Sequence, residues 1–154
     1  MMVREALAAD IPALVHLRMA LFCEVGELAR PDEDPALWEA TLAYFTRAQE
    51  EGSARSWLVE VEGEAVACGT LALFVRPPYP GNLAGREAYL LNMYTRPAWR
   101  KRGMASALLD AMAAHAREQR LGKLWLHASE QGRPLYERLG FVSNPACLEW
   151  YPAP

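Results

Sequence analysis

Cysteine is scarce in this sequence, with three residues in 154. Cys23, Cys68 and Cys147 are odd in number and far apart, so they fit neither a disulfide framework nor the paired spacing of a zinc site. We expect them to be small buried hydrophobic side chains. The three histidines are equally dispersed and are not grouped with cysteines or acids at ligand spacing. No cofactor metal is therefore expected.

Long apolar runs are also missing, and no stretch is long enough to span a membrane. The first residues lack the charged-then-apolar pattern of a secretory signal, which predicts a cytoplasmic protein without membrane contact. Charge of one sign is not in large excess, since the formal net charge is −3. A balance on the acidic side argues against a surface that binds nucleic acid, although one local turn is strongly basic.

What is present is the composition of a folded domain. Hydrophobic residues make up 52% of the chain and charged residues 23%, which is close to the globular average and unlike disordered or coiled-coil sequences. A chain of this length can bury a core without disulfides or metals. We predict one domain over residues 1–154.

The first half of the chain has the pattern of a strand, two helices and a β-hairpin. Asp10 and Asp34 are each followed by a proline in the next turn, which is typical of a capped helix start. Alternation before and after the turn at residues 62–64 predicts a pair of antiparallel strands. The expected elements are a strand at 2–6, helices at 11–24 and 35–50, and strands at 57–61 and 65–75.

The second half alternates strands and helices after a loop at 76–86 that is rich in proline and glycine. A strand, helix and strand in succession predict a right-handed parallel crossover. We expect an α/β domain with a mixed central sheet of about seven strands and four helices. The remaining elements are strands at 88–95 and 123–128, helices at 105–120 and 131–139, and short strands at 141–143 and 147–151.

The turn between the strand at 88–95 and the helix at 105–120 is basic and contains one glycine. Gly103 lets the backbone approach a ligand closely, and the first N–H groups of the helix lack intrahelical partners. Arg100, Lys101 and Arg102 add positive charge beside them. Together these features predict a phosphate-binding cradle.

The spacing of two motifs narrows this prediction. Arg100, Gly103 and Ala105 fit an arginine, two residues, glycine, one residue, alanine pattern, and Tyr136 precedes the Gly140-Phe141 pair by four residues. In this order, with one helix and one strand between them, the motifs resemble those of the GNAT superfamily of acyl-CoA-dependent N-acyltransferases. The resemblance implies transfer of an acetyl group from acetyl-CoA to a primary amine, by direct attack in a ternary complex.

The resemblance also implies roles for particular residues. Tyr136 takes the position of the general acid that protonates coenzyme A as it leaves. The backbone at residues 93–95 is expected to contact the pantetheine arm and thioester, which requires an unpaired strand edge. Ser129 stands where many members carry an asparagine. The expected coenzyme contacts are Met93, Tyr94, Thr95, Arg100, Lys101, Arg102, Gly103, Met104, Ala105, Ser106 and Ser129.

The general base has no clear position in the sequence. Members of the family often place a glutamate on the central strand, whereas residues 89–94 contain no acid. A water chain ending at Asn92 or Tyr94 is one alternative. Side-chain candidates are Glu24, Glu27, Glu87 and His127.

Two further points stay open at this stage. The acidic residues between the first two helices form either a solvated loop or a lip that attracts a cationic amine. The missing strand acid favours an alternative function, a non-catalytic acyl-CoA-binding sensor or partner-binding module on the same fold. A homodimer is common in the resembling family, and the expected partners are acetyl-CoA and an amine acceptor.

Overall fold

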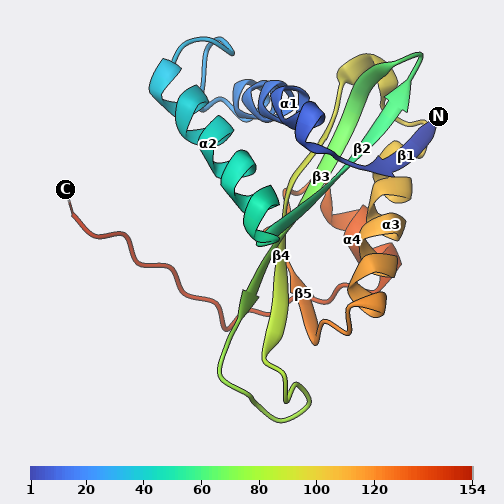
Figure 1. Ribbon diagram of the computed structural model, residues 1–154. Coiled ribbons are helices and arrows are strands. Elements are labelled where there is room, and N and C mark those ends of the chain that lie inside the picture. The colour runs from blue at the N-terminus through green and yellow to red at the C-terminus, as the bar shows by residue number, and fades with distance from the viewer. Residues whose placement is uncertain (154) are drawn as a thin grey trace.

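The structure is a computed structural model that describes residues 1–153, and its centre is a five-stranded sheet in the order β1-β2-β3-β4-β5. Helices α1 and α2 cover one face and α3 the other, with α4 beside α3 (Figure 1). The elements are β1 Met2–Glu5, α1 Ile11–Glu24, α2 Pro35–Glu51, β2 Ala54–Val61, β3 Glu64–Val75, β4 Arg86–Thr95, α3 Met104–Glu118, β5 Lys123–Trp125 and α4 Arg133–Leu139.

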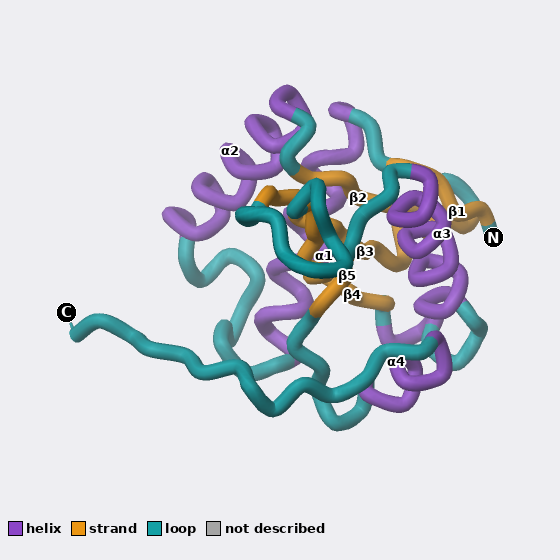
Figure 2. Tube along the Cα trace, turned by 90° about the horizontal axis from the view of Figure 1, so that it is seen from below, coloured by secondary structure: helices purple, strands orange, loops and turns teal. Residues whose placement is uncertain are grey.

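Each face of the sheet has its own hydrophobic core. Leu108, Leu109 and Met112 of α3 are buried against one face, because they recur at helical spacing on the side of α3 that meets the sheet. Leu14 and Leu17 of α1 are buried against the other face. Seen from below, the strands lie between these two helical layers (Figure 2).

The two predicted helix caps have different outcomes. Asp34 caps α2 as expected, since its Oδ1 accepts the N–H of Leu37 at 3.0 Å. Asp10 does not cap α1. Its carboxylate accepts the N–H of Leu7 at 2.7 Å and forms an ion pair with Arg4 at 2.7 Å, so the start of α1 receives no side-chain cap.

The loop at 76–86 is held by a carboxylate buried in the sheet. Glu87 has no exposed surface, and it accepts hydrogen bonds from the Tyr79 hydroxyl at 2.5 Å and from Arg76 Nη1 at 3.2 Å. Burial acts to raise the pKa of Glu87, but the hydrogen bonds from Tyr79 and Arg76 outweigh it and hold the pKa below its usual range. The loop is therefore a rigid connection.

Glu87→Gln is expected to lower the free energy of unfolding at neutral pH by about 1.5–3 kcal/mol, because the variant loses hydrogen bonds to an ionised group. A carboxyl with a lowered folded-state pKa stabilises the fold above its unfolded pKa, near 4.5, and this stabilisation disappears as pH falls through the folded value. Urea unfolding at pH 7 and pH 3 measures the effect. A difference between wild type and variant that is as large at pH 3 as at pH 7 would contradict this explanation.

Strand β4 contains a bulge at its centre. Leu91 pairs with Thr70 and Tyr94 pairs with Cys68, so Asn92 and Met93 together oppose the single residue Gly69. Asn92 has a φ of 58°, which is the left-handed conformation that such irregularities use. The position opposite is closely packed, since a Cβ there would lie 2.5 Å from the Met93 sulfur and that side chain would have to move.

Strands β4 and β5 are paired only briefly. Residues 87–89 of β4 pair in parallel with residues 123–125 of β5, and β5 then ends. Residues 90–95 of β4 consequently have no strand partner on the β5 side within the described chain. The unpaired strand edge expected at residues 93–95 is therefore present.

The prediction of about seven strands is wrong, because residues 1–153 contain five. The strands expected at 141–143 and 147–151 are absent, and the C-terminal segment leaves the domain as extended chain (Figure 1). A strand exists only by pairing with a neighbouring strand, and neither segment has a strand partner in residues 1–153. Cys147 in this segment is exposed, so the expectation of burial fails there, whereas it holds for Cys68.

None of the helices in the range 1–153 is both long and apolar enough to cross a membrane. The same residues contain no group of three histidine, cysteine or acidic side chains placed to hold a metal ion.

Candidate active site

The start of α3 has the backbone of an anion-binding turn. Lys101 and Gly103 both have positive φ, at 60° and 79°, and α3 begins at Met104 directly after them. A Cβ built on Gly103 would meet no atom within 4 Å, so the space in front of the helix is open. The first N–H groups of α3 lack partners four residues back and carry the positive end of the helix dipole. This turn can receive a phosphate group.

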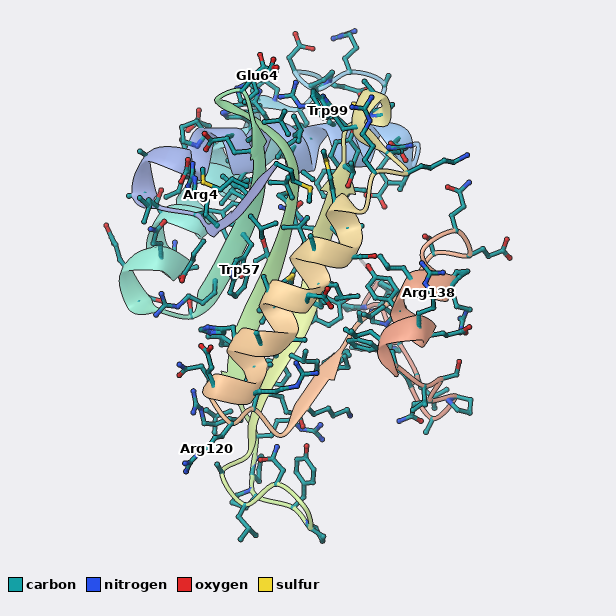
Figure 3. The ribbon with its side chains drawn as sticks, turned by 90° about the vertical axis from the view of Figure 1, so that its right-hand side faces the viewer. Arg4, Trp57, Glu64, Trp99, Arg120 and Arg138 are labelled. Atoms are coloured by element: carbon teal, nitrogen blue, oxygen red, sulfur yellow. The ribbon has the colours of Figure 1, made fainter. Side chains whose placement is uncertain are left out.

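The basic side chains at residues 100–102 of the turn point to different places. Arg102 stacks on Trp99, 4.9 Å from the ring centroid, and Trp99 lies near the beginning of α3 (Figure 3). Lys101 and Arg102 are exposed. Arg100 instead donates from Nε to the Thr95 carbonyl at 2.9 Å, and its guanidinium pairs with Glu24. Arg100 thus joins the turn to β4 and α1, whereas Lys101 and Arg102 form no ion pair within residues 1–153.

The open edge of β4 leads away from this turn. Met93 packs on the α3 side of the sheet, whereas Tyr94 is buried on the α1 side. Because the side chains of Met93 and Tyr94 are occupied by packing, these two residues can offer only backbone N–H and C=O groups to a ligand along the edge. An extended molecule with amide groups can pair with such an edge as a strand would.

Tyr136 lies on α4, on the same side of the sheet as α3. It packs against the α3-side core and makes an edge contact with Phe141, with ring centroids 5.8 Å apart. Burial raises the pKa of Tyr136 above its ordinary value, so the phenol keeps its proton at neutral pH. A protonated phenol in this place can donate to a departing anion.

Comparison with known proteins shows the family of this chain. The model of the Acetyltransferase (GNAT) family matches residues 15–141, which is most of the chain. The chain belongs to the GNAT acetyltransferase family. Members of this family use acetyl-CoA as the acyl donor. The search of the curated proteins found no match.

Solved GNAT structures share the fold over nearly the whole chain. A predicted acetyltransferase from Clostridium acetobutylicum, solved with acetyl-CoA, is 29% identical, with a TM-score of 0.88 over 97% of this chain and 95% of that one. A GCN5-related N-acetyltransferase from Ralstonia eutropha JMP134 is 27% identical, with a TM-score of 0.80 over 97% of each chain. Glucosamine-6-phosphate N-acetyltransferase from Arabidopsis thaliana, at 14% identity and a TM-score of 0.74 over 97% of each chain, shares the fold alone.

Ser129 has a local structural contact in this GNAT chain. Its hydroxyl accepts the N–H of Gly132 at 3.1 Å, and its carbonyl accepts the N–H of Arg133 at 3.0 Å. The residue thereby satisfies N–H groups at the start of α4, the helix that carries Tyr136. Its hydroxyl oxygen is therefore used as an acceptor within the loop before α4.

The candidate bases of this GNAT chain are separated by the fold. Glu24 is paired with Arg100, and Glu87 is enclosed by the 76–86 loop. Asn92 is buried in the bulge, where its Nδ2 faces the Cys68 sulfur at 3.6 Å and its Oδ1 has no hydrogen-bond partner in the described chain. His127 contacts Tyr89 and Glu149.

Three acidic side chains of the loop between α1 and α2 have hydrogen-bond or ion-pair partners within the loop or at the start of α2. Glu33 accepts the N–H of Ala29 at 2.5 Å, Asp32 pairs with Arg30 at 3.2 Å, and Asp34 caps α2. These contacts match the description of a solvated loop with a capped helix start. The contacts of His127 with Tyr89 and Glu149 were not expected from the sequence, because they join distant parts of the chain.

Proposed function

We propose that this chain is an N-acetyltransferase that moves the acetyl group of acetyl-CoA to a primary amine by direct attack in a ternary complex. The observation that carries the proposal is the presence of two features in succession: a helix start at Gly103 that can bind an anion, and an open β4 edge at residues 90–95. The Clostridium relative whose structure contains acetyl-CoA supports it.

Different groups of the chain would hold different parts of acetyl-CoA. Backbone N–H groups of residues 101–106 would hold the pyrophosphate, with charge from Lys101 and Arg102. Residues 93–95 would hold the pantetheine arm through the backbone, and Ser129 would act by shaping the start of α4. Holding the thioester in place makes the attack effectively unimolecular. Acetyl-CoA supplies an activated acyl group whose thiolate departs when protonated.

Tyr136 would be the proton donor to that thiolate, a role worth about 10² to 10⁴ in rate. A covalent route through Cys68 is disfavoured, since burial raises the pKa of its thiol to about 12 and a thiol is not a nucleophile until ionised. Direct attack by the amine needs no such nucleophile.

A panel of primary amines incubated with acetyl-CoA and the purified protein tests the proposal. Release of free thiol is followed by a colorimetric reagent, and the amine product is identified by mass spectrometry. We expect saturable thiol release that requires one class of amine, together with an acetylated product. Tight acetyl-CoA binding without thiol release for any amine would instead support the sensor function.

A further inference from the structure

A chain of hydrogen bonds crosses from β4 to the C-terminal segment. The Tyr89 hydroxyl lies 2.6 Å from Nδ1 of His127, and Nε2 of His127 lies 3.0 Å from Oε1 of Glu149. The Tyr151 hydroxyl donates to the other oxygen of Glu149 at 2.5 Å. Four side chains from three parts of the sequence are therefore joined in one line.

The hydrogen-bonding capacity of Glu149 and His127 determines where the protons lie among these side chains. An ionised carboxylate only accepts hydrogen bonds, so Glu149 requires the proton of a neutral His127 to lie on Nε2. Nδ1 then carries the lone pair, and the Tyr89 hydroxyl must donate to it. Burial raises the pKa of Tyr89, so the phenol is protonated at neutral pH. When Nδ1 gains a proton, the carboxylate of Glu149 stabilises the resulting imidazolium, as in a catalytic triad.

The fold places these hydrogen-bonded side chains next to the open edge of β4, at the end nearest β5. Ala88 and Leu90 are buried against α3, so Tyr89 between them projects from the opposite face. Tyr89 pairs with Trp125, the last residue of β5, and the two rings are 4.7 Å apart. Tyr136 lies on the α3 side. The proton donor and the hydrogen-bonded chain thus flank the same edge from opposite faces of the sheet.

We infer that Tyr89, His127 and Glu149 are the proton acceptor for the amine, an inference that depends on the proposed function. The acceptor binds as an ammonium beside the rings of Tyr89 and Trp125, whose faces attract cations. Tyr89 is the catalytic residue that touches the ammonium, His127 takes the proton through Tyr89, and Glu149 positions His127.

The transfer converts an ammonium and acetyl-CoA into an amide, free coenzyme A and one proton. One ammonium proton moves to the Tyr89 oxygen as the Tyr89 proton moves to Nδ1 of His127. The nitrogen lone pair forms the new N–C bond at the thioester carbonyl, the C–S bond breaks, and the sulfur takes the Tyr136 proton. The surplus proton of the new amide nitrogen restores Tyr136. His127, which is 54% exposed, returns its proton to water, so one proton is released per turnover.

The test compares Tyr89→Phe and His127→Gln with His115→Gln, a control on α3 whose ring makes an edge contact with Trp57 of β2. Measured with the best amine of the panel, kcat/KM of both test variants is expected to fall about 10²-fold at pH 7. The deficit should shrink toward pH 10, where an alkylamine deprotonates unaided. Acetyl-CoA binding by calorimetry should equal that of wild type in all three variants.

A second readout is independent of activity. In a sample labelled with ¹⁵N-histidine, wild-type His127 is expected to show the Nε2–H tautomer, and Glu149→Gln should change the tautomer populations. Test variants with wild-type kcat/KM from pH 6 to 10, or with a deficit that is constant with pH, would overturn the inference while leaving the proposed function intact. Absence of transfer by the wild type would instead remove the proposed function.

Discussion

Gly103→Glu is expected to weaken coenzyme A binding by at least about 10²-fold, because like charges placed in contact cost several kcal/mol. The new carboxylate would stand in the open space before α3, where the pyrophosphate is expected to bind. It would also oppose the contribution of Lys101 and Arg102. Calorimetric titration with coenzyme A measures the change in dissociation constant.

Gly52→Glu is a matched control for this substitution. Gly52 closes α2 with a φ of 68°, and a Cβ built there would also meet no atom within 4 Å. A non-glycine residue in the left-handed conformation costs about 1–2 kcal/mol at either position. Both variants should therefore show a similar loss of thermal stability, and only Gly103→Glu should lose binding. Equal dissociation constants of the two variants for coenzyme A would contradict a phosphate-binding site at Gly103.

Tyr136→Phe is expected to reduce kcat by about 10² to 10⁴ while leaving the dissociation constant of acetyl-CoA unchanged. The substitution removes only the hydroxyl, so the contact of the ring with Phe141 is kept. Stopped-assay thiol release and calorimetry separate the two quantities.

Tyr44→Phe, at an exposed position on α2, is the control for loss of a tyrosine hydroxyl. It should leave kcat unchanged. If Tyr136→Phe kept wild-type turnover, the proton for the thiolate would come from elsewhere. If it lost acetyl-CoA binding instead, the hydroxyl would be a binding group and not the acid.

Local features of the fold could be predicted because their causes lie within a few residues. Asp34 caps the helix that begins at its own position, Gly140 closes α4 in the left-handed conformation, and Gly103 precedes α3. The GNAT family assignment follows from motifs of the same local kind.

Other features depend on contacts between distant parts of the chain, and the sequence does not reveal them. Arg100 fits the phosphate-binding pattern, yet its guanidinium is held by Glu24 from α1. The bond between Tyr89 and His127 joins residues 38 apart. The number of strands was overestimated because alternation at 141–143 and 147–151 reports the pattern of a strand without showing whether a partner strand is available.

The central claim is that the coenzyme binds to the backbone at the start of α3 and along the open edge of β4. Amide ¹H–¹⁵N spectra of the ¹⁵N-labelled protein, recorded during titration with acetyl-CoA, test it most directly. We predict that the largest shift changes fall at residues 101–106 and 93–95, and saturate together. Changes concentrated elsewhere on the domain, or no saturable change in a folded protein, would contradict the account.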